Sequence, residues 1–280
     1  MPTKRSHSAA FQGELGAFSH AAAEKLLGER IEMRPCETFK DVFAALRSNQ
    51  VTHAVIPIEN TLHGSVHENY DHLLEYEVPI RGETSIRISH QLITLADVRF
   101  RDIRRVFSHP VAINQCRKFF DKHRDIEPVP FYDTAGSVKM LREKRPDGSA
   151  AIASVSAAAI YGGRILRKNI EDDRQNFTRF FLLTKQDGIL APAGTPWKTS
   201  LVFSTRNIPG ALFKAMACFA LRDLSLTKIE SRPLRGKPWE YLFYVDLIGR
   251  DSDPTVRHAL ENLSETTEFV KVLGSYRPTP

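Results

Sequence analysis

The sequence predicts an α/β protein with two domains, because the pattern of apolar segments changes once along its 280 residues. Up to about residue 186, short apolar segments alternate with amphipathic ones, which is typical of βα units around a largely parallel sheet. After a break rich in Gly and Pro at 187–196, the pattern predicts the order β-α-β-β-α-β, the ferredoxin-like arrangement. We therefore expect one domain at 8–186, a linker at 187–198 and a second domain at 199–276.

The elements of the first domain follow from capping residues and apolar spacing. Ser19 is expected to cap a helix that stops at Gly28, and Thr38 to cap the next helix. In the helix after Thr38, apolar side chains recur every three or four residues and so share one face. Further helices are expected around 69–76, from Pro110, after Thr134 and after Ser156, and strands at 54–58, 88–95, 105–107, 128–132, 150–153 and 180–183.

The elements of the second domain are marked by two prolines. Pro209 and Pro254 each suit the first turn of a helix, where the missing N–H is not needed. Both helices carry their apolar side chains on one face, as expected for helices that cover a sheet. Strands are expected at 200–205, 224–229, 241–248 and 269–273.

Composition limits the classes of function. The net charge is +6, but Lys and Arg are interleaved with 33 acids and no basic helix appears, so nucleic-acid binding is not expected. Most of the positive excess is expected to be solvated surface, and the balance also suits an enzyme that collects a small dianion. No apolar run is long enough to cross a bilayer, and no secretory signal is visible. The three cysteines lie in apolar helical patterns and predict reduced core residues of a cytoplasmic protein: Cys36, Cys116 and Cys218.

Several other chemistries lack their sequence patterns. His63 and His67 are four residues apart, but no His-Glu-x-x-His pattern is present, so a metal site is only a minor option. No Gly-x-Ser-x-Gly elbow supports a hydrolase triad, and neither a Walker loop nor a nucleotide-binding glycine motif is present. We therefore expect neither a metal nor a cofactor.

The stretch Asn176-Phe177-Thr178-Arg179-Phe180 carries the strongest functional signal. It places a hydroxyl beside a guanidinium at the start of a buried strand, and strand ends often form ligand clefts. A hydroxyl can donate to a departing oxygen, and an arginine can hold a carboxylate through two parallel hydrogen bonds. The alternative interpretation is an ordinary strand entry with a surface arginine.

Four other loops place polar residues at strand ends or helix starts. The loop from Gly13 to Ser19 either brings backbone N–H groups to an anion at a helix start or forms only a tight turn with an N-cap. The other three are 59–65, Ser108-His109-Pro110 with Gln115 on the following helix, and Asp133-Thr134-Ala135-Gly136.

Together, these motifs resemble those of prephenate dehydratases, in the same order and over nearly the whole chain. One residue departs from the family pattern, since Val111 stands where a glutamine usually follows Ser-His-Pro. The second domain is similar to the ACT regulatory domain of that family through Pro209-Gly210-Ala211-Leu212 and Glu230-Ser231-Arg232-Pro233. The matching segments of the first domain are Gly13-x-x-Gly16-x-Phe18-Ser19, Pro57-Ile58-Glu59-Asn60-Thr61 through Gly64-Ser65-Val66, Ser108-His109-Pro110, Gln115-Cys116, Asp133-Thr134-Ala135, Ala150-Ala151-Ile152-Ala153-Ser154 and Asn176-Phe177-Thr178-Arg179-Phe180.

The resemblance implies a catalytic domain of two α/β lobes, like type II periplasmic binding proteins, with the active site between the lobes. Residues 8–83 and a returning strand near 179–184 would form one lobe, and roughly 84–170 the other. The first motif begins near residue 11, so we expect no mutase domain before it and a monofunctional enzyme. The implied reaction converts prephenate to phenylpyruvate, carbon dioxide and water.

The resemblance also implies roles for individual residues. Thr178 would donate to the leaving hydroxyl, with the proton finally supplied by a relay, and Arg179 would be a carboxylate clamp or an electrostatic stabiliser. Glu59 would orient its neighbours, because a carboxylate facing a dianion would repel it. The expected substrate-binding residues are Ser19, Asn60, Thr61, Ser108, Gln115, Asp133, Thr134, Asn176 and Phe180.

The ACT-like domain implies feedback by L-phenylalanine. A helix start can present N–H groups to the carboxylate of the amino acid, and a strand end of a partner subunit would complete the pocket. We therefore expect a homo-oligomer, a dimer or a tetramer, and the alternative is a purely structural dimerisation module. The expected effector-binding residues are Gly210, Ala211, Leu212, Glu230, Ser231 and Arg232.

Two alternative functions remain open at this point. An arogenate dehydratase would remove water and carbon dioxide from the amino-acid analogue of prephenate, and segments 69–74 and 228–231 look similar to plant enzymes of that kind. A solute-binding or amino-acid-sensing protein could use the same cleft without turnover, although Thr178 and Arg179 argue against it. Prephenate is the substrate that we expect to be preferred.

Overall fold

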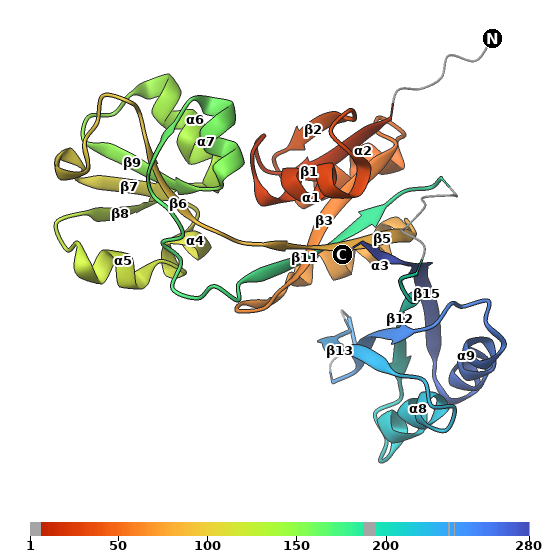
Figure 1. The fold of residues 1–280 in the computed structure, drawn as a ribbon. Helices are drawn as coiled ribbons and strands as arrows, with labels where there is room; N and C mark the ends of the chain where they lie inside the picture. The colour runs from red at the N-terminus through yellow and green to blue at the C-terminus, as the bar shows by residue number, and fades with distance from the viewer. Residues whose placement is uncertain (1–6, 187–193, 235, 238, 280) are drawn as a thin grey trace, which may run out of the picture. The chain divides into compact units, whose positions relative to one another are not determined.

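The computed structural model describes residues 7–186, 194–234, 236–237 and 239–279 (Figure 1). The chain divides into two compact units. Unit 1 comprises Met1–His72 and Thr84–Leu182, and unit 2 comprises Leu73–Glu83 and Leu183–Pro280. Most of the expected linker, at 187–193, and the N-terminal residues 1–6 lie outside the described residues.

The first sheet of unit 1 has the strand order β5-β11-β3-β1-β2, with the short strand β4 paired to β3. Strand β1 is parallel to both β2 and β3, and its three central residues are fully buried. Two helices that follow β1 and β2 in the chain, α1 and α2, pack against β1 and β3 and explain this burial. The elements are β1 (Ser8–Gln12), α1 (Phe18–Leu27), β2 (Glu32–Cys36), α2 (Phe39–Arg47), β3 (His53–Asn60), β4 (Gly64–Ser65), α3 (His67–Tyr76), β5 (Ile80–Arg87) and β11 (Phe177–Leu183). The end of α3 and the first half of β5 belong to unit 2.

The second sheet of unit 1 has the order β10-β6-β9-β7-β8. Its central strand β9 is buried on both faces, since Ala151 and Ala153 pack with α6 and α7, whereas Ala150 and Ile152 pack toward α4 and α5. The alternation of side chains along a strand therefore sends one set to each helical layer. The elements are β6 (Gln91–Thr94), a 3-10 helix (Phe100–Asp102), β7 (Arg105–Ser108), α4 (Pro110–Asn114), α5 (Arg117–Lys122), β8 (Glu127–Pro130), α6 (Thr134–Lys144), β9 (Ser149–Ala153), α7 (Val155–Tyr161) and β10 (Arg164–Arg167).

These two sheets confirm the expected two-lobed α/β architecture and correct several details. The second sheet is mixed rather than largely parallel, because β6 runs antiparallel to both β9 and β10. Ser19 is not a cap, since α1 begins at Phe18 and Ala17 precedes it, whereas Thr38 forms a full capping box with Asp41. The helix expected after Ser156 begins at Val155, and Ser154 caps it.

The remaining corrections concern strands and one cysteine. Strand β3 runs on to Asn60, and the strand expected at 88–95 is confined to 91–94. Five of the described strands were missed. Strands β4 and β16 have only two residues each, and β2, β5 and β10 carry many polar or exposed residues. Cys36 lies half-buried on β2 rather than in a helix, whereas Cys116 and Cys218 are buried as expected.

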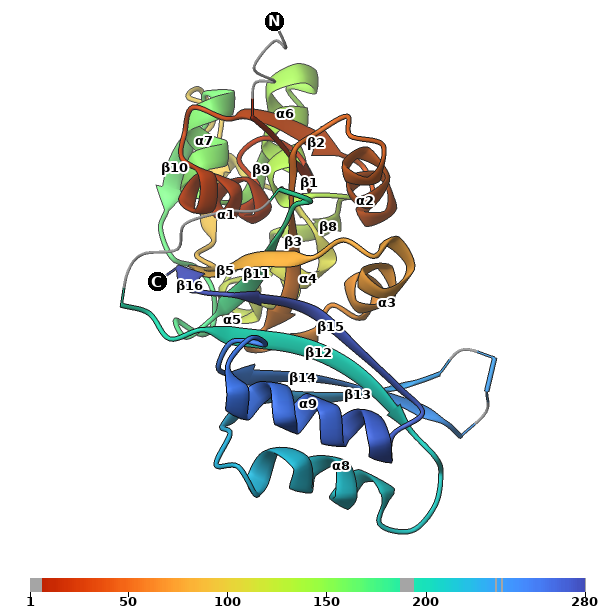
Figure 2. The same cartoon turned by 90° about the vertical axis from the view of Figure 1, so that its right-hand side faces the viewer.

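Unit 2 contains the ferredoxin-like arrangement that the sequence predicts. Its sheet has the order β13-β14-β12-β15, and the three neighbouring pairs are all antiparallel. Helices α8 and α9 lie on one side of this sheet (Figure 2) and share a core with it. The last strand, β16 (Pro278–Thr279), pairs with β5. The elements are β12 (Lys198–Thr205), α8 (Ala211–Ala220), β13 (Leu226–Pro233), β14 (Tyr241–Ile248), α9 (Pro254–Thr266) and β15 (Phe269–Tyr276).

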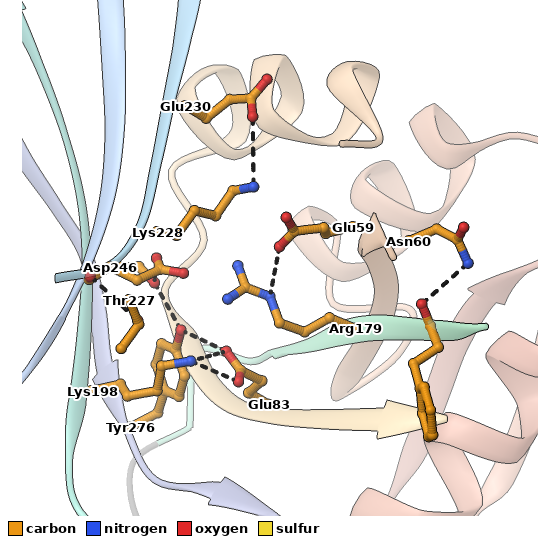
Figure 3. A network of polar contacts seen from close by, with 12 residues as sticks. Glu59, Asn60, Glu83, Arg179, Lys198, Thr227, Lys228, Glu230, Asp246 and Tyr276 are labelled. Atoms are coloured by element: carbon orange, nitrogen blue, oxygen red, sulfur yellow. Dashed lines mark hydrogen bonds and ion pairs between the residues drawn. The ribbon is translucent and has the colours of Figure 1, made fainter. Parts of the chain in front are cut away.

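Unit 2 also buries a network of charged and hydroxyl groups on the first half of β5 and on its own sheet (Figure 3). Nζ of Lys198 lies 2.8 and 3.1 Å from the carboxylate oxygens of Glu83, and the hydroxyl of Tyr276 donates to the same carboxylate at 3.2 Å. Ser200 then connects Tyr276, at 2.7 Å, to the carboxylate of Asp246, at 2.6 Å. Because both charges of the Lys198–Glu83 pair are buried, each depends on the other for solvation.

No helix within the described ranges is long and apolar enough to span a membrane.

Glu83→Gln should destabilise the protein far more than the same change at Glu77. The first change leaves Lys198, whose side chain is 10% exposed, as a buried charge without its counter-ion, which costs about 3–5 kcal/mol. The second breaks a pair with Lys271 in which Glu77 is 75% exposed, and should cost about 0–1 kcal/mol. Urea unfolding of both variants measures the difference, and equal losses would contradict the importance of the buried pair.

Candidate functional site

Asn60, at the end of β3, joins the start of β11 through its side-chain amide. Its Oδ1 accepts hydrogen bonds from the backbone N–H groups of Leu62 and His63, both at 3.0 Å. Its Nδ2 donates to Oδ1 of Asn176 at 2.8 Å and to Oγ1 of Thr178 at 2.9 Å. Because two backbone donors hold the carbonyl end of Asn60, its amide nitrogen has to face β11.

This contact orients the hydroxyl of Thr178. A threonine hydroxyl has one proton to donate and two lone pairs that accept. Since Oγ1 of Thr178 accepts from Asn60, its own proton can point elsewhere. Thr178 is 9% exposed and lines a cavity of about 270 Å³.

The cavity around Thr178 is lined by residues from both lobes of unit 1. The first lobe supplies the beginning of α1, the segment from Asn60 to Val66 and the beginning of β11, and the second supplies the beginnings of α4 and α6. The lining residues are Phe18, Ser19, Pro57, Asn60, His63, Gly64, Ser65, Val66, Ile88, His90, His109, Val111, Ala112, Gln115, Thr134, Thr178 and Phe180.

Two helix N-termini border this cavity and favour an anion. Phe18 and Ser19 are the first residues of α1, and Thr134 is the first residue of α6. Backbone N–H groups in the first turn of a helix have no partner within the helix and carry partial positive charge. The cavity can therefore hold a carboxylate without a lysine or arginine, and none of the residues that line it is of either type.

The loop before α1 is held tightly against the second lobe. A Cβ atom on Gly16 would lie 2.6 Å from Cα of Ala157, and Gly16 has φ +87°, which a side chain disfavours. Oγ of Ser154 donates to the carbonyl of Gly16 at 2.6 Å. Glycine is therefore needed here for close packing and for its backbone conformation, which in turn fixes the position of the α1 N-terminus.

An adjoining cavity of about 570 Å³ has a different electrostatic character. It shares six residues with the first cavity but is also lined by the carboxylates of Glu37, Glu68 and Asp133. Asp133 caps α6 by accepting the N–H of Gly136 at 2.7 Å, and burial raises the pKa of this carboxyl. The cleft therefore has a part free of carboxylates around Thr178 and an acidic part beside it.

Three histidines line the cavity around Thr178, and two of them contact Gln115. Oε1 of Gln115 lies 2.8 Å from Nε2 of His90, and Nε2 of Gln115 lies 3.1 Å from Nδ1 of His63. Burial lowers the pKa of His90, although the hydrogen bond to Gln115 and the carboxylate of Glu171 act in the opposite direction. The third is His109, whose Nδ1 accepts the N–H of Val111 at 3.2 Å.

The comparison with known proteins identifies the family. The family model described as prephenate dehydratase matches residues 9–188. The chain belongs to the prephenate dehydratase family. A protein of Arabidopsis thaliana described as arogenate dehydratase/prephenate dehydratase 2, chloroplastic, is 44% identical over 276 residues, which cover 95% of this chain and 72% of that protein.

Two solved structures extend the likeness over almost the whole chain. A prephenate dehydratase from Arthrobacter aurescens in complex with L-Phe is 30% identical, has a TM-score of 0.87 and covers 96% of this chain and 90% of its own. A chain described as a novel type of quorum-quenching acylase is 34% identical, has a TM-score of 0.88 and covers 98% of this chain and 99% of its own. The fold thus extends through unit 2 as well as through the part matched by the prephenate dehydratase model.

The structure brings together most of the residues expected to bind the substrate of a prephenate dehydratase. Val111, which departs from the family pattern, is also in the wall and makes it apolar where a glutamine would be polar. Asp133 lines the acidic part of the cleft. The expected residues around the first cavity are Ser19, Asn60, Gln115, Thr134, Thr178 and Phe180.

Arg179 does not line this cavity, contrary to its expected role as a clamp. Side chains alternate along β11, so Thr178 and Phe180 face the cavity and Arg179 faces the other side. There its Nε lies 3.7 Å from the carboxylate of Glu59, as Figure 3 shows, and its guanidinium stacks over the ring of Phe181 at 5.1 Å. Residues adjacent in a strand were expected to share one site, and the strand geometry separates them.

Three further expected residues hold the site together from outside the cavity wall. Oγ1 of Thr61 donates to the carbonyl of Gln175 at 2.8 Å and accepts the N–H of Phe177 at 3.0 Å. Ser108 is fully buried and donates to the carbonyl of Ile152 at 2.7 Å. Asn176 is also fully buried; its side chain contacts Asn60, and its carbonyl accepts the N–H of Ile88 at 2.8 Å.

Sequence reasoning missed His63 and His90 as members of this site. His63 was considered as a metal ligand with His67 and lies in the polar loop 59–65, but it was not among the expected site residues, and no spacing links either histidine to Thr178. Two signals were present in the sequence: the polar loop 59–65 contains His63, and the Ser108-His109-Pro110 motif contains His109. The part of the chain that the structure describes holds no group of three or more His, Cys, Asp or Glu side chains suited to a metal ion.

The expected effector-binding residues of unit 2 lie at one end of its sheet. Gly210, with φ 78°, directly precedes α8, which begins with Ala211 and Leu212. In the strand register, Thr205 at the end of β12 and Pro233 at the end of β13 both lie opposite Tyr241. The loop before α8 therefore follows the same end of the sheet as the last residues of β13, which include Glu230-Ser231-Arg232.

Proposed function

We propose that this protein catalyses the decarboxylating dehydration of prephenate to phenylpyruvate, carbon dioxide and water. One observation supports this most strongly: Asn60 holds Thr178 as an acceptor at the wall of a cavity, so that the Thr178 hydroxyl proton is available to a ligand. A donor at this point suits a reaction in which a hydroxyl group leaves. A sensing protein has no need of such a donor, because it binds its ligand without breaking a bond to a leaving group.

The proposed chemistry needs little more than orientation and one donor. The bond from the ring to its carboxylate breaks, carbon dioxide leaves, and the electron pair completes the aromatic ring while the C–O bond breaks. The departing oxygen becomes negative in the transition state, where a hydrogen bond from Thr178 is worth more than in the ground state. Aromatisation supplies the driving force.

The other residues of the cavity are proposed to hold the dianion. The N-termini of α1 and α6 favour its carboxylates, with Ser19 and Thr134 as hydroxyl donors. Gln115 supplies an amide, and Phe180 forms an apolar surface for the ring. We assign Arg179 a positioning role, because it pairs with Glu59, the neighbour of Asn60 on β3.

A second candidate function is the same reaction on arogenate. Arogenate carries an ammonium where prephenate has a keto group, and an ammonium needs acceptors or an anion nearby. The acidic part of the cleft offers Glu37, Glu68 and Asp133 next to the Thr178 cavity. The Arabidopsis relative is named for both substrates. We keep prephenate as the preferred substrate, because the reacting centre is common to both and the cavity around Thr178 needs no ammonium.

For unit 2 we propose regulation by L-phenylalanine. The support is the loop at Gly210, whose positive φ lets backbone N–H groups at the start of α8 approach a carboxylate, and the solved relative that contains L-Phe. Segment 230–232 on the edge strand β13 would come from a second copy of the chain. Exposed apolar side chains on unit 2, such as Phe213 (76%) and Ile229 (51%), support a homo-oligomer, a dimer or a tetramer.

Within the proposal, residues 8–186 form the catalytic domain, 187–198 the linker and 199–276 the ACT regulatory domain. The expectation of a cytoplasmic location stays a prediction, and its basis is the set of three free thiols.

Thr178→Ala should lower kcat for prephenate by about two to three orders of magnitude, with a much smaller change in KM, because the lost hydrogen bond acts mainly in the transition state. Thr178→Ser, which keeps the hydroxyl, is the matched control and should retain part of the activity. Formation of phenylpyruvate by the folded variants is the measurement. A kcat of Thr178→Ala close to that of the unmodified protein would remove Thr178 from the mechanism.

The ratio of kcat/KM for prephenate to that for arogenate should exceed one. Asp133→Asn keeps the helix cap and removes the buried carboxylate, so it should weaken turnover of arogenate more than turnover of prephenate. Glu37→Gln removes a second carboxylate of the adjoining acidic cavity and should have the same effect. A clear advantage of arogenate in the unmodified protein, reduced by these changes, would make arogenate the substrate.

L-Phenylalanine should bind to the intact protein in calorimetry, and Gly210→Val should weaken its affinity by roughly tenfold or more, about 1.4 kcal/mol. Gly28→Val is the matched control, since Gly28 has a similar φ of 82° and equally open surroundings but lies in unit 1. It should carry similar backbone strain and leave the affinity unchanged. Absence of any binding heat with the intact protein would exclude the regulatory proposal.

A further inference from the structure

The proposed reaction consumes one proton, and Thr178 cannot be its final source. Prephenate is a dianion, and the products are the phenylpyruvate monoanion, carbon dioxide and water, so one proton has to be added to the departing hydroxide. A threonine hydroxyl is a poor acid and must regain any proton that it gives up. The cavity therefore has to contain an acid that supplies this proton. This inference rests on the proposed function.

The possible acids around Thr178 are few. Among the residues that line this cavity, the only ones with titratable side chains are three histidines. Aspartate, glutamate, cysteine, tyrosine, lysine and arginine are all absent from its lining. Histidine is also the side chain that ordinarily exchanges a proton between pH 5 and 8.

Two of the three histidines are poorly placed to carry the proton. His90 is 1% exposed, and burial lowers its pKa, which disfavours its protonated form. His109 uses Nδ1 to accept the N–H of Val111, and burial lowers its pKa against the effect of the Asp133 carboxylate. If Nδ1 of His109 were protonated, its N–H would point at the N–H of Val111, and the hydrogen bond between them would be lost.

His63 differs from both in its exposure and its anchoring. It is exposed to solvent and can therefore take a proton from bulk water. Its backbone N–H donates to Oδ1 of Asn60, the residue whose amide nitrogen donates to Thr178. The same side chain thus fixes the backbone of His63 and the hydroxyl of Thr178 at one cavity.

We propose that His63 is a further catalytic residue, the acid that protonates the departing hydroxide. In the protonated imidazole both ring nitrogens carry a proton. As the C–O bond breaks, Thr178 donates a hydrogen bond to the leaving oxygen, and one N–H of His63 gives its proton to that oxygen, forming water. Neutral His63 then regains a proton from solvent.

Gln115 and His90 favour the return of His63 to its neutral form. In the structure the amide nitrogen of Gln115 faces Nδ1 of His63, which must accept, and Oε1 faces Nε2 of His90, which must donate. Protonation of His63 requires Gln115 to turn its oxygen toward Nδ1. The proton of His90 then has to move to its own Nδ1, which is buried and without a hydrogen-bond partner within the described residues. That state costs free energy, so Gln115 and His90 favour the neutral form in which Nδ1 of His63 accepts.

Charged groups lie near this cavity at three places, one of which is the pair of Arg179 and Glu59 next to Asn60. Beyond His90 lies Glu171, which accepts the His90 backbone N–H at 2.9 Å and is paired with Arg87 at 2.6 Å. On the side of the adjoining cavity are the carboxylates of Glu37, Glu68 and Asp133. The remaining charge in the cavity is the bound dianion itself, which favours a protonated imidazole before the reaction and favours it less after carbon dioxide leaves.

The test compares the dependence of kcat on pH for three forms of the full-length protein with prephenate. His67→Gln is the matched control, since His67 is also exposed, lies four residues further on and does not line the cavity. The unmodified protein and His67→Gln should lose kcat as the pH rises from 6 to 8, because the acid loses its proton. His63→Gln should have a kcat about 10²-fold lower at pH 6, without this fall and with little change in KM.

A second variant separates an acid from a merely structural residue. Gln115→Glu places a carboxylate that accepts from both imidazoles, so it favours protonated His63 and should move the fall in kcat to higher pH by about one pH unit. It should also raise KM, because the carboxylate repels the dianion.

The outcomes are distinguishable. A His63→Gln profile that matches the unmodified protein in kcat and in its fall with pH would overturn the role of His63 and leave the proposed function intact. An unmodified protein that turns over neither prephenate nor arogenate would instead overturn the proposed function itself.

Discussion

The site depends on the hydrogen bonds of one amide, Asn60. Its two ends hold the chain that follows β3 and the start of β11, which are more than 100 residues apart in sequence. Because the carbonyl end is fixed by backbone N–H groups, the amide nitrogen faces the start of β11, where it contacts Asn176, the Phe177 carbonyl and Thr178. The direction of the Thr178 hydroxyl follows from this, and so does the position of His63. A substitution of Asn60 would therefore disturb Thr178, His63 and the start of β11 together.

The walls of the cavity are set by packing rather than by hydrogen bonds. Gly16 approaches Ala157 more closely than any side chain would permit, and Ser154 holds the Gly16 carbonyl. This contact places the N-terminus of α1 beside that of α6, so helix ends take over the electrostatic role that basic side chains often have. The result is a cavity without lysine or arginine for an anion, next to an acidic one, and the difference between the two bears on the choice between prephenate and arogenate.

Much of the fold could be predicted from local pattern. The two-lobed α/β part, the ferredoxin-like part and the ends of helices such as α2 and α9 follow from apolar spacing, caps and prolines. Strands with many exposed polar residues, β2 above all, were missed, because nothing in their local pattern distinguishes them from loops. Within the site, Thr178 was found from its motif, but Arg179 was assigned to the same cavity although strand alternation turns it toward Glu59.

The sequence by itself determined the family resemblance, the order of elements and the candidates that lie within motifs. These depend on short segments, whose residue types and spacing are visible in one dimension. Only the tertiary structure decided which candidates meet. His63, His90 and Gln115 come from three separate segments, and no local spacing relates them; the packing of the two lobes around one cavity brings them into hydrogen-bond contact. The direction of the Thr178 hydroxyl and of the ring nitrogens of His63 and His90 likewise follows from partners that are distant in the chain, which is why the proton donor could not be assigned from the sequence.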